Sequence, residues 1–268
     1  MNKKLKIAFV APFHETVPPK KYGSIERIVC NLIKYLSGQG HEITLLAAGS
    51  DKHAFPQGVT VINVLKHTIR NTIDMFNLDP ETAKCNLEAI GTTHAALALQ
   101  KEKFDIITCQ YALFFFPNAQ KALKNMKNSL KKSGNIGISV HGSKDSVPFF
   151  SSIIDSVTKY VPDYVPPGSP DLDRFGTKSA LKKEVSKAGF SKITVKDYVF
   201  HFSPGKFEDY WRNYLKYIAK PLKEKLNDLD YSKRKELKQL VKDKTSQYTK
   251  QNGKILFPWQ VLILGAKN

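Results

Sequence analysis

The stretch Phe104-Asp105-Ile106-Ile107-Thr108-Cys109 decides the fold, because a short apolar run of this kind is typical of a strand buried on both faces of a sheet. Similar apolar runs occur before and after it in the sequence. This strand lies between the three predicted strands that precede it and the three that follow it. The seven predicted strands are Lys6–Pro12, His41–Ala48, Val59–Leu65, Asp105–Cys109, Ile136–Val140, Lys192–Phe202 and Val261–Leu264.

Apolar residues at helical spacing separate most of these strands. The predicted helices are Ser24–Leu36, Thr82–Lys103, Asn118–Lys132, Val147–Tyr160, Thr177–Ala188, Lys206–Leu226 and Ser232–Gln247. In the second of them we expect Leu87, Ile90, Ala95 and Leu99 to face the core. Strands that alternate with helices predict an α/β fold with a Rossmann-like, doubly wound, mostly parallel sheet. The last two strands lack a packed crossover helix, which leaves an antiparallel direction open for one of them.

Length and composition favour one globular domain over residues 1–268. The chain is 41% hydrophobic and 25% charged, both ordinary values for a globular protein. No apolar run approaches the roughly 18–20 residues that a membrane helix needs. The basic start has no signal-peptide cleavage site, so we expect a cytoplasmic protein. Cys30, Cys85 and Cys109 show no metal-ligand spacing, which fits a reducing compartment and predicts no metal site.

The chain carries a net charge of +18, from 42 basic and 24 acidic residues. Much of the excess lies in Lys216–Lys250. Such a stretch is either a solvated helix face or a contact for an anionic membrane, a nucleic acid or a phosphorylated substrate. Because no nucleic-acid motif accompanies the charge, we expect no specific nucleic-acid binding.

The loop after the first strand leads into a helix at Gly23-Ser24. Ser24 can cap that helix, and the free backbone N–H groups there can hold an anion such as a diphosphate. The stretch Pro18-Pro19-Lys20-Lys21-Tyr22-Gly23-Ser24-Ile25-Glu26 resembles the family 4 retaining glycosyltransferases, and the resemblance covers residues 1–107. It implies a nucleotide sugar whose phosphates lie beside Gly23 and Ser24. The donor-binding C-terminal domain of that family has no counterpart in the sequence.

Residues 104–268 resemble a different family. The spacing Phe104-Asp105, Phe115-Phe116-Pro117 and Leu130-Lys131-Lys132-Ser133-Gly134 is similar to that of class I S-adenosylmethionine methyltransferases of the small-molecule, quinone C-methyltransferase type. The resemblance implies that Gln110, Tyr111 and Ala112 line the methyl-donor pocket, at the strand edge where doubly wound sheets bind ligands. Phe114 is expected either to wall this pocket or to pack in the core.

The sequence departs from the methyltransferase pattern at two places. The glycine-rich turn after the first strand is absent, and Asp51 is only a late substitute for the acidic residue that ends the second strand. We therefore expect impaired cofactor binding.

The catalytic residue is left unassigned. His14 on the first loop and His141 after the fifth strand are weak candidates for contacting a substrate or, in the case of His14, for acting as a base. An exposed loop histidine and a satisfied surface histidine are the alternatives.

The favoured hypothesis is a methyltransferase-like protein that uses S-adenosylmethionine and acts on a small molecule. The alternatives are a nucleotide-sugar glycosyltransferase-like protein and a non-catalytic basic binding protein. The change of resemblance near Phe104–Thr108 indicates a hybrid, formed by natural recombination or by a joining error.

Overall fold

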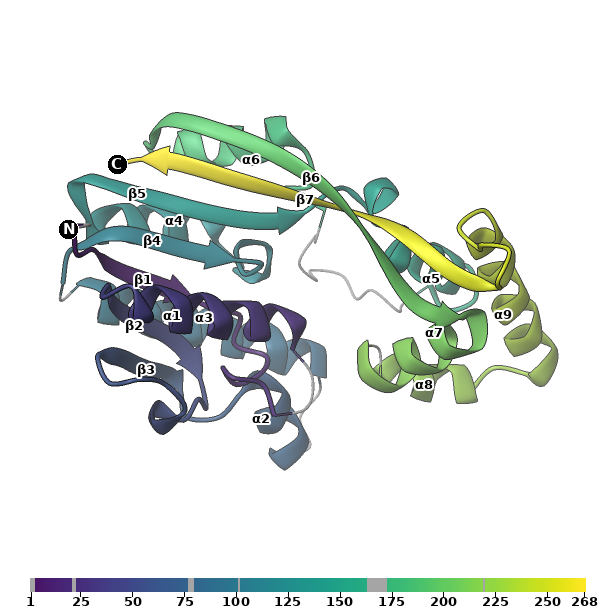
Figure 1. Ribbon diagram of the computed structural model, residues 1–268. Helices are drawn as coiled ribbons and strands as arrows, with labels where there is room; N and C mark the ends of the chain where they lie inside the picture. The colour runs from purple at the N-terminus through teal and green to yellow at the C-terminus, as the bar shows by residue number, and fades with distance from the viewer. Residues whose placement is uncertain (1–2, 21–22, 77–79, 101, 163–172, 219) are drawn as a thin grey trace. The chain divides into compact units, whose positions relative to one another are not determined.

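The computed structural model describes residues 3–20, 23–76, 80–100, 102–162, 173–218 and 220–268. The side chains of Ser24 and of residues 80–85, 100, 217–218, 220–221 and 224 lie outside this description. The strands form one seven-stranded sheet in the order β3-β2-β1-β4-β5-β7-β6 (Figure 1). They are β1 (Lys6–Val10), β2 (Glu42–Ala48), β3 (Val59–Leu65), β4 (Phe104–Gln110), β5 (Leu130–His141), β6 (Ser191–Lys206) and β7 (Lys254–Lys267).

Helices connect most of the strands. The α-helices are α1 (Ser24–Gly38), α2 (Ile69–Phe76), α3 (Pro80–Gln100), α4 (Ala119–Ser129), α5 (Pro148–Val157), α6 (Lys178–Lys187), α7 (Phe207–Asn213), α8 (Lys220–Asn227) and α9 (Tyr231–Ser246). Strands β1 to β5 pair in parallel, and β7 runs opposite to β5 and β6 (Figure 1). The predicted seven-stranded α/β sheet with an antiparallel end is confirmed.

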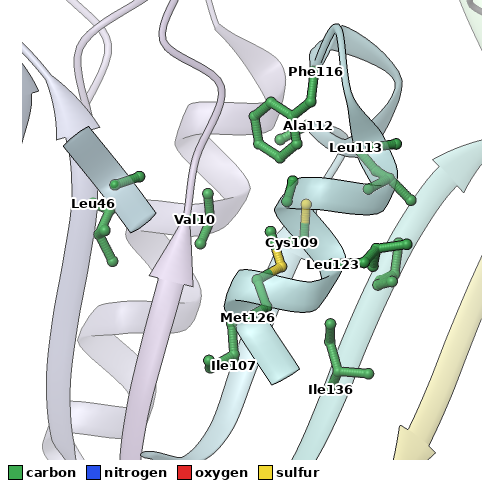
Figure 2. Packing of buried hydrophobic residues seen from close by; sticks show 14 of the residues in the cluster. Val10, Leu46, Ile107, Cys109, Ala112, Leu113, Phe116, Leu123, Met126 and Ile136 are labelled. Atoms are coloured by element: carbon green, nitrogen blue, oxygen red, sulfur yellow. The ribbon is translucent and has the colours of Figure 1, made fainter. Parts of the chain in front are cut away.

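Alternate residues of the strands point to opposite faces of the sheet, and each face has its own apolar cluster. On one face, Ile7 and Phe9 of β1 pack with Val29 and Ile33 of α1. On the other, Val10, Ile107 and Cys109 lie under helices α3 and α4 (Figure 2). Figure 2 shows the α4 side chains Leu123 and Met126 above strand β4. The continuous apolar runs of the sequence are therefore the consequence of a sheet covered on both faces.

The boundary between α4 and β5 differs from the prediction. The predicted helix Asn118–Lys132 ends at Ser129, and β5 begins at Leu130 rather than at Ile136. Gly134, two residues beyond the predicted helix, lies within the strand. A Cβ there would lie 3.1 Å from the carbonyl oxygen of Asp105, so this glycine is used for a close approach of two backbones.

Three other expectations about helices are wrong in detail. The predicted Lys206–Leu226 helix is divided into α7, a π-helical turn at Tyr214–Ile218, and α8. Helix α2 was not predicted; it begins after Thr68, whose hydroxyl accepts the Asn71 N–H at 3.2 Å. Ile90 of α3 is exposed rather than directed to the core, because Glu88, Ala95 and Leu99 define the buried face.

The chain divides into two compact units. The first contains residues 1–140, 170–197 and 262–268, and the second contains residues 141–169 and 198–261. The single-domain organisation stays a prediction. Inside the second unit, an aromatic core surrounds Phe149, whose carbonyl accepts the Tyr210 hydroxyl at 2.5 Å. The second unit thus has a core of its own.

Candidate functional site

The topology places a candidate site in the first unit, at the carboxyl ends of β1 and β4. These two strands are neighbours in the sheet, but β1 leads through α1 to β2 on one side, whereas β4 leads through α4 to β5 on the other. Loops that leave such a pair in opposite directions create the crevice where doubly wound sheets bind ligands. The loop after β1 and the loop after β4 are therefore the segments to examine.

The loop after β1 is fixed by the end of β2. The Val17 N–H donates to the Ser50 hydroxyl at 2.8 Å, and the Ser50 N–H donates to the Asn63 side chain at 2.8 Å. Phe13 is buried beside Gly91 of α3, where a Cβ would lie 2.8 Å from its ring. This loop is thus held at both ends, and its middle presents His14 and Glu15.

His14 and Glu15 each face an oppositely charged or polar partner. His14 Nε2 lies 3.3 Å from the Glu88 carboxylate of α3, and the Glu88 side chain is 2% exposed. Glu15 Oε1 lies 2.5 Å from Arg70 Nε. The His14 ring also lies 4.8 Å from the ring of Phe115, centroid to centroid, which joins this cluster to the loop after β4. An imidazole beside a buried carboxylate can accept a proton, because the carboxylate stabilises the imidazolium.

The expected anion site at Gly23 and Ser24 already contains a carboxylate. Gly23 has φ +113°, and a Cβ on it would lie 2.5 Å from the Glu26 carboxylate. Burial raises the pKa of Glu26 to about 7, and the nearby Glu15 adds to the rise. The Ser24 side chain lies outside the described residues. A diphosphate at this helix end would have to displace the Glu26 carboxylate.

The loop after β4 contains the methyl-donor residues implied by the methyltransferase resemblance. Tyr111 has a left-handed backbone, φ 50°, and its N–H donates to the Ser139 carbonyl at 2.9 Å. Ala112 and Phe114 are fully buried members of the core (Figure 2 labels Ala112), so core packing is the observed role of their side chains. Tyr111, Phe114 and Phe115 form a chain of ring contacts that reaches His14.

Arg174 holds this loop from outside. Its guanidinium Nη2 donates to the carbonyl oxygens of Leu113, Phe114 and Phe116, at 3.0, 3.2 and 2.5 Å. The same group lies 4.7 Å from the ring centroid of Phe175. One guanidinium nitrogen is therefore shared by three carbonyl groups of this turn, and the Leu113 carbonyl also accepts the Phe116 N–H at 3.3 Å.

Gln110 and Ser139 lie side by side at the carboxyl edge of β4 and β5, since they are register partners in this parallel pair. The Ser139 hydroxyl is buried, and it has no hydrogen-bond partner among the described residues. A buried hydroxyl without a partner is costly, so it marks a place where a ligand group can bind.

Two more of the expected site residues make short-range contacts of their own. Asp51 is exposed, and its carboxylate accepts the His53 N–H at 2.9 Å to cap a short 3-10 helix, Lys52–Ala54. His141 belongs to the second unit, where it is buried and its Nδ1 lies 2.8 Å from the Gly142 carbonyl oxygen. Burial raises the pKa of Cys109 to about 12, as expected for a core residue rather than a nucleophile.

The partners of His14 and Glu15 were not anticipated. Glu88 is the clearest case, because a glutamate on the buried face of α3 contradicts the apolar pattern of that face. The feature of the sequence that could have indicated this role is a glutamate between Leu87 and Gly91, on the apolar side of the predicted helix. Arg70 gave no signal, because it lies on the helix that was not predicted.

Comparison with known proteins gives one family match. The model of the family described as methyltransferase domain matches residues 37–138. The ubiquinone biosynthesis O-methyltransferase of Glaesserella parasuis serovar 5 (strain SH0165) is 31% identical over 112 residues, which are 42% of this chain and 45% of that protein. The chain therefore spans less than half the length of this curated relative.

Two solved structures illustrate the range of similarity. A SAM-dependent methyltransferase from Archaeoglobus fulgidus is 11% identical, with 99% of this chain and 87% of that chain covered and a TM-score of 0.43. A glycosyltransferase involved in avilamycin A biosynthesis is 25% identical, with 39% of this chain and 25% of that chain covered and a TM-score of 0.26.

The expected hybrid with a boundary near Phe104 is not supported. The methyltransferase match begins at residue 37, inside α1, and continues through β2, β3 and β4. The sheet is likewise continuous across this position, because β4 pairs with β1 on one side and with β5 on the other. Across residues 37–138, this chain is thus similar to methyltransferase domains.

Proposed function

We propose that the first unit is an S-adenosylmethionine-dependent methyltransferase that acts on a small molecule. The observation that carries the proposal is the methyltransferase domain match over residues 37–138, which ends within β5. The match includes β4, whose carboxyl end forms one side of the candidate site, whereas β1 and His14 lie outside the matched residues. Methyl transfer depends on positioning and on exclusion of water more than on covalent chemistry by the protein.

The residues present fit the donor on one side of the crevice. S-adenosylmethionine has hydroxyl, amino and carboxylate groups, and the Ser139 hydroxyl beside Gln110 offers an unmatched partner for such a group. On the β1 side no glycine-rich turn follows the strand, and the Asp51 carboxylate caps a short helix. We therefore assign the donor to Gln110, Tyr111 and Ser139, with Ala112 and Phe114 as the buried support of that loop.

His14 is the proton acceptor in this proposal. When bound, S-adenosylmethionine supplies an activated methyl group. His14 takes the proton of the hydroxyl or amino group of the acceptor, and the buried Glu88 carboxylate at 3.3 Å balances the charge of the imidazolium. Phe115 against the His14 ring limits the access of water to the pair.

Calorimetric titration with S-adenosylmethionine tests the donor site. We expect saturable heat with the wild-type protein at submillimolar to millimolar donor. Ser139→Ala should weaken the affinity by about fivefold, because it removes a buried hydrogen-bonding group worth ~1 kcal/mol. The Ser133→Ala variant is the matched control, since Ser133 is an exposed residue of the same strand.

Two outcomes of this titration contradict the proposal. Absence of heat at millimolar donor removes the methyltransferase function. Tight binding that Ser139→Ala does not change places the donor away from the β4–β5 edge.

A thermal-shift panel of uridine and guanosine diphosphate sugars tests the glycosyltransferase alternative, in which the sugar nucleotide competes with the Glu26 carboxylate.

The basic stretch supports a second proposal, peripheral contact with an anionic membrane. Lys233, Lys235 and Lys242 are exposed on α9, and none of the helices in the described part of the chain is long and apolar enough to span a bilayer. We expect the protein to sediment with vesicles that contain anionic lipid at low salt and to be released as the salt concentration rises. Equal binding to neutral vesicles contradicts a charge-driven contact. A cytoplasmic location stays a prediction.

A further inference from the structure

The edge of the sheet at β6 carries an unusual run of apolar residues. Strand β6 is the last in the sheet order, so among the described residues only β7 pairs with it. Within the second unit, four of its side chains are exposed: Tyr198 by 52%, Val199 by 57%, Phe200 by 47% and Phe202 by 40%. Exposed edge strands normally carry charges or prolines that prevent pairing with another chain.

Such charges and prolines are present only on either side of this run. Lys196 and Asp197 precede it and Pro204 follows it, whereas Tyr198–Phe202 contains no lysine, arginine, aspartate or glutamate. The strand is also ordered by contacts on its inner face. Phe200 stacks on Trp259 with ring centroids 5.8 Å apart. A partner that pairs with this edge would therefore not have to order the segment first.

A β-strand is the partner that suits this edge best. The outer edge of a strand presents unpaired N–H and C=O groups, and these groups are satisfied by another strand rather than by lipid or by a helix. The sequence of the run is also nearly self-complementary about Phe200. Antiparallel pairing with the same run places Tyr198 opposite Phe202, Val199 opposite His201, and Phe200 opposite Phe200. Aromatic pairs in directly opposite positions stabilise antiparallel strands.

We propose that Tyr198–Phe202 is a dimerisation edge, at which β6 of a second copy of this chain pairs antiparallel about a twofold axis at Phe200. Such an interface is closed, because each copy contributes the same segment to the other. It is also small, so the dimer is a weak one that forms as the protein concentration rises. The inference does not depend on the methyl donor or on the site in the first unit.

Sedimentation velocity over a concentration series, about 1 to 500 μM, tests the proposal. We expect a reversible shift from monomer to dimer. Val199→Lys should raise the dimer dissociation constant at least about tenfold, because it introduces two like charges near the twofold axis. Val199 is the chosen position because Phe200 and Phe202 pack on aromatic residues of the core. Tyr35→Lys is the matched control, since Tyr35 is an exposed residue of α1 at 66%.

Near-ultraviolet circular dichroism of both variants shows whether they fold. A second measurement tests the register of the strand pairing, in which Val199 lies opposite His201 of the second copy. In a mixture of Val199→Cys and His201→Cys proteins, oxidation should therefore form the disulfide between the two variants faster than between two copies of either variant. A monomer at every concentration overturns the proposal, as does a dimer that both lysine variants weaken equally. Open-ended growth with concentration contradicts a closed pair. Monomeric protein that binds vesicles through Val199 identifies a lipid surface in place of the second copy.

Discussion

Replacement of Arg174 by methionine is expected to lower the free energy of unfolding by about 3 kcal/mol. Methionine keeps the apolar stem but removes the guanidinium that the carbonyl groups of Leu113, Phe114 and Phe116 share. The Leu113 carbonyl also accepts the Phe116 N–H at 3.3 Å, so the loss falls mainly on the carbonyls of Phe114 and Phe116, and a buried polar group that loses a partner is costly. Urea unfolding of the variant and the wild-type protein measures the difference.

Arg212→Met is the control for this prediction. Arg212 makes an ion pair with Asp209 at 2.5 Å, but both side chains are largely exposed. Exposed pairs contribute less than about 1 kcal/mol, so this variant should lose little stability. Equal losses in the two variants would mean that Arg174 does not hold the loop after β4. If the donor site lies on that loop, Arg174→Met should also weaken the affinity for S-adenosylmethionine, whereas Arg212→Met should not.

Replacement of Glu26 by glutamine is expected to stabilise the protein above pH 7. The pKa of Glu26 is about 7 in the folded protein and 4.5 for the unperturbed group. Below pH 4.5 the group is protonated in both states. As the pH rises from 4.5 to 7, the unfolded state loses the proton first, and the free energy of unfolding falls by about 3 kcal/mol. Glutamine keeps the shape of the side chain and has no proton to lose.

The difference between variant and wild type should therefore be small at pH 4.5 and should reach its full value by about pH 8. Chemical unfolding at a series of pH values measures it. Glu236→Gln, at an exposed position of α9, should change stability by less than about 0.5 kcal/mol at every pH. A Glu26→Gln protein that is less stable than the wild type at pH 8 would show that the helix N-terminus and Arg70 stabilise the carboxylate more than burial disfavours it.

The first four strands could be read from the sequence with little error, whereas β6 extends past the predicted Phe202 to Lys206 and β7 begins at Lys254 rather than at Val261. Val59–Leu65 agrees with the prediction at both ends, and Phe104–Gln110 extends it by one residue at each end. Apolar runs of this length have few alternatives in a sheet that is covered on both faces. The start of β5 was missed because Gly134 is a helix-ending signal in the sequence, whereas its use as a backbone contact depends on the position of β4.

The candidate site was predictable only in part. The loop after β4 was chosen from the methyltransferase resemblance and from the general use of the carboxyl edge of doubly wound sheets for binding, and its role stays a prediction. The residues that meet His14 were not found, since Glu88 is 74 positions away in the sequence and only the packing of α3 brings it to 3.3 Å. Asp51 and His141 follow or end strands as expected, and each makes a short-range hydrogen-bond contact; their part in a site stays a prediction.

The sequence by itself determined the α/β class and the number of strands in the sheet, because apolar periodicity reports which faces of each element are buried. Tertiary structure alone decided the rest. It paired His14 with Glu88, placed the Glu26 carboxylate at the end of α1, and left Tyr198–Phe202 exposed at an edge. These features depend on contacts between distant segments, which local patterns do not encode.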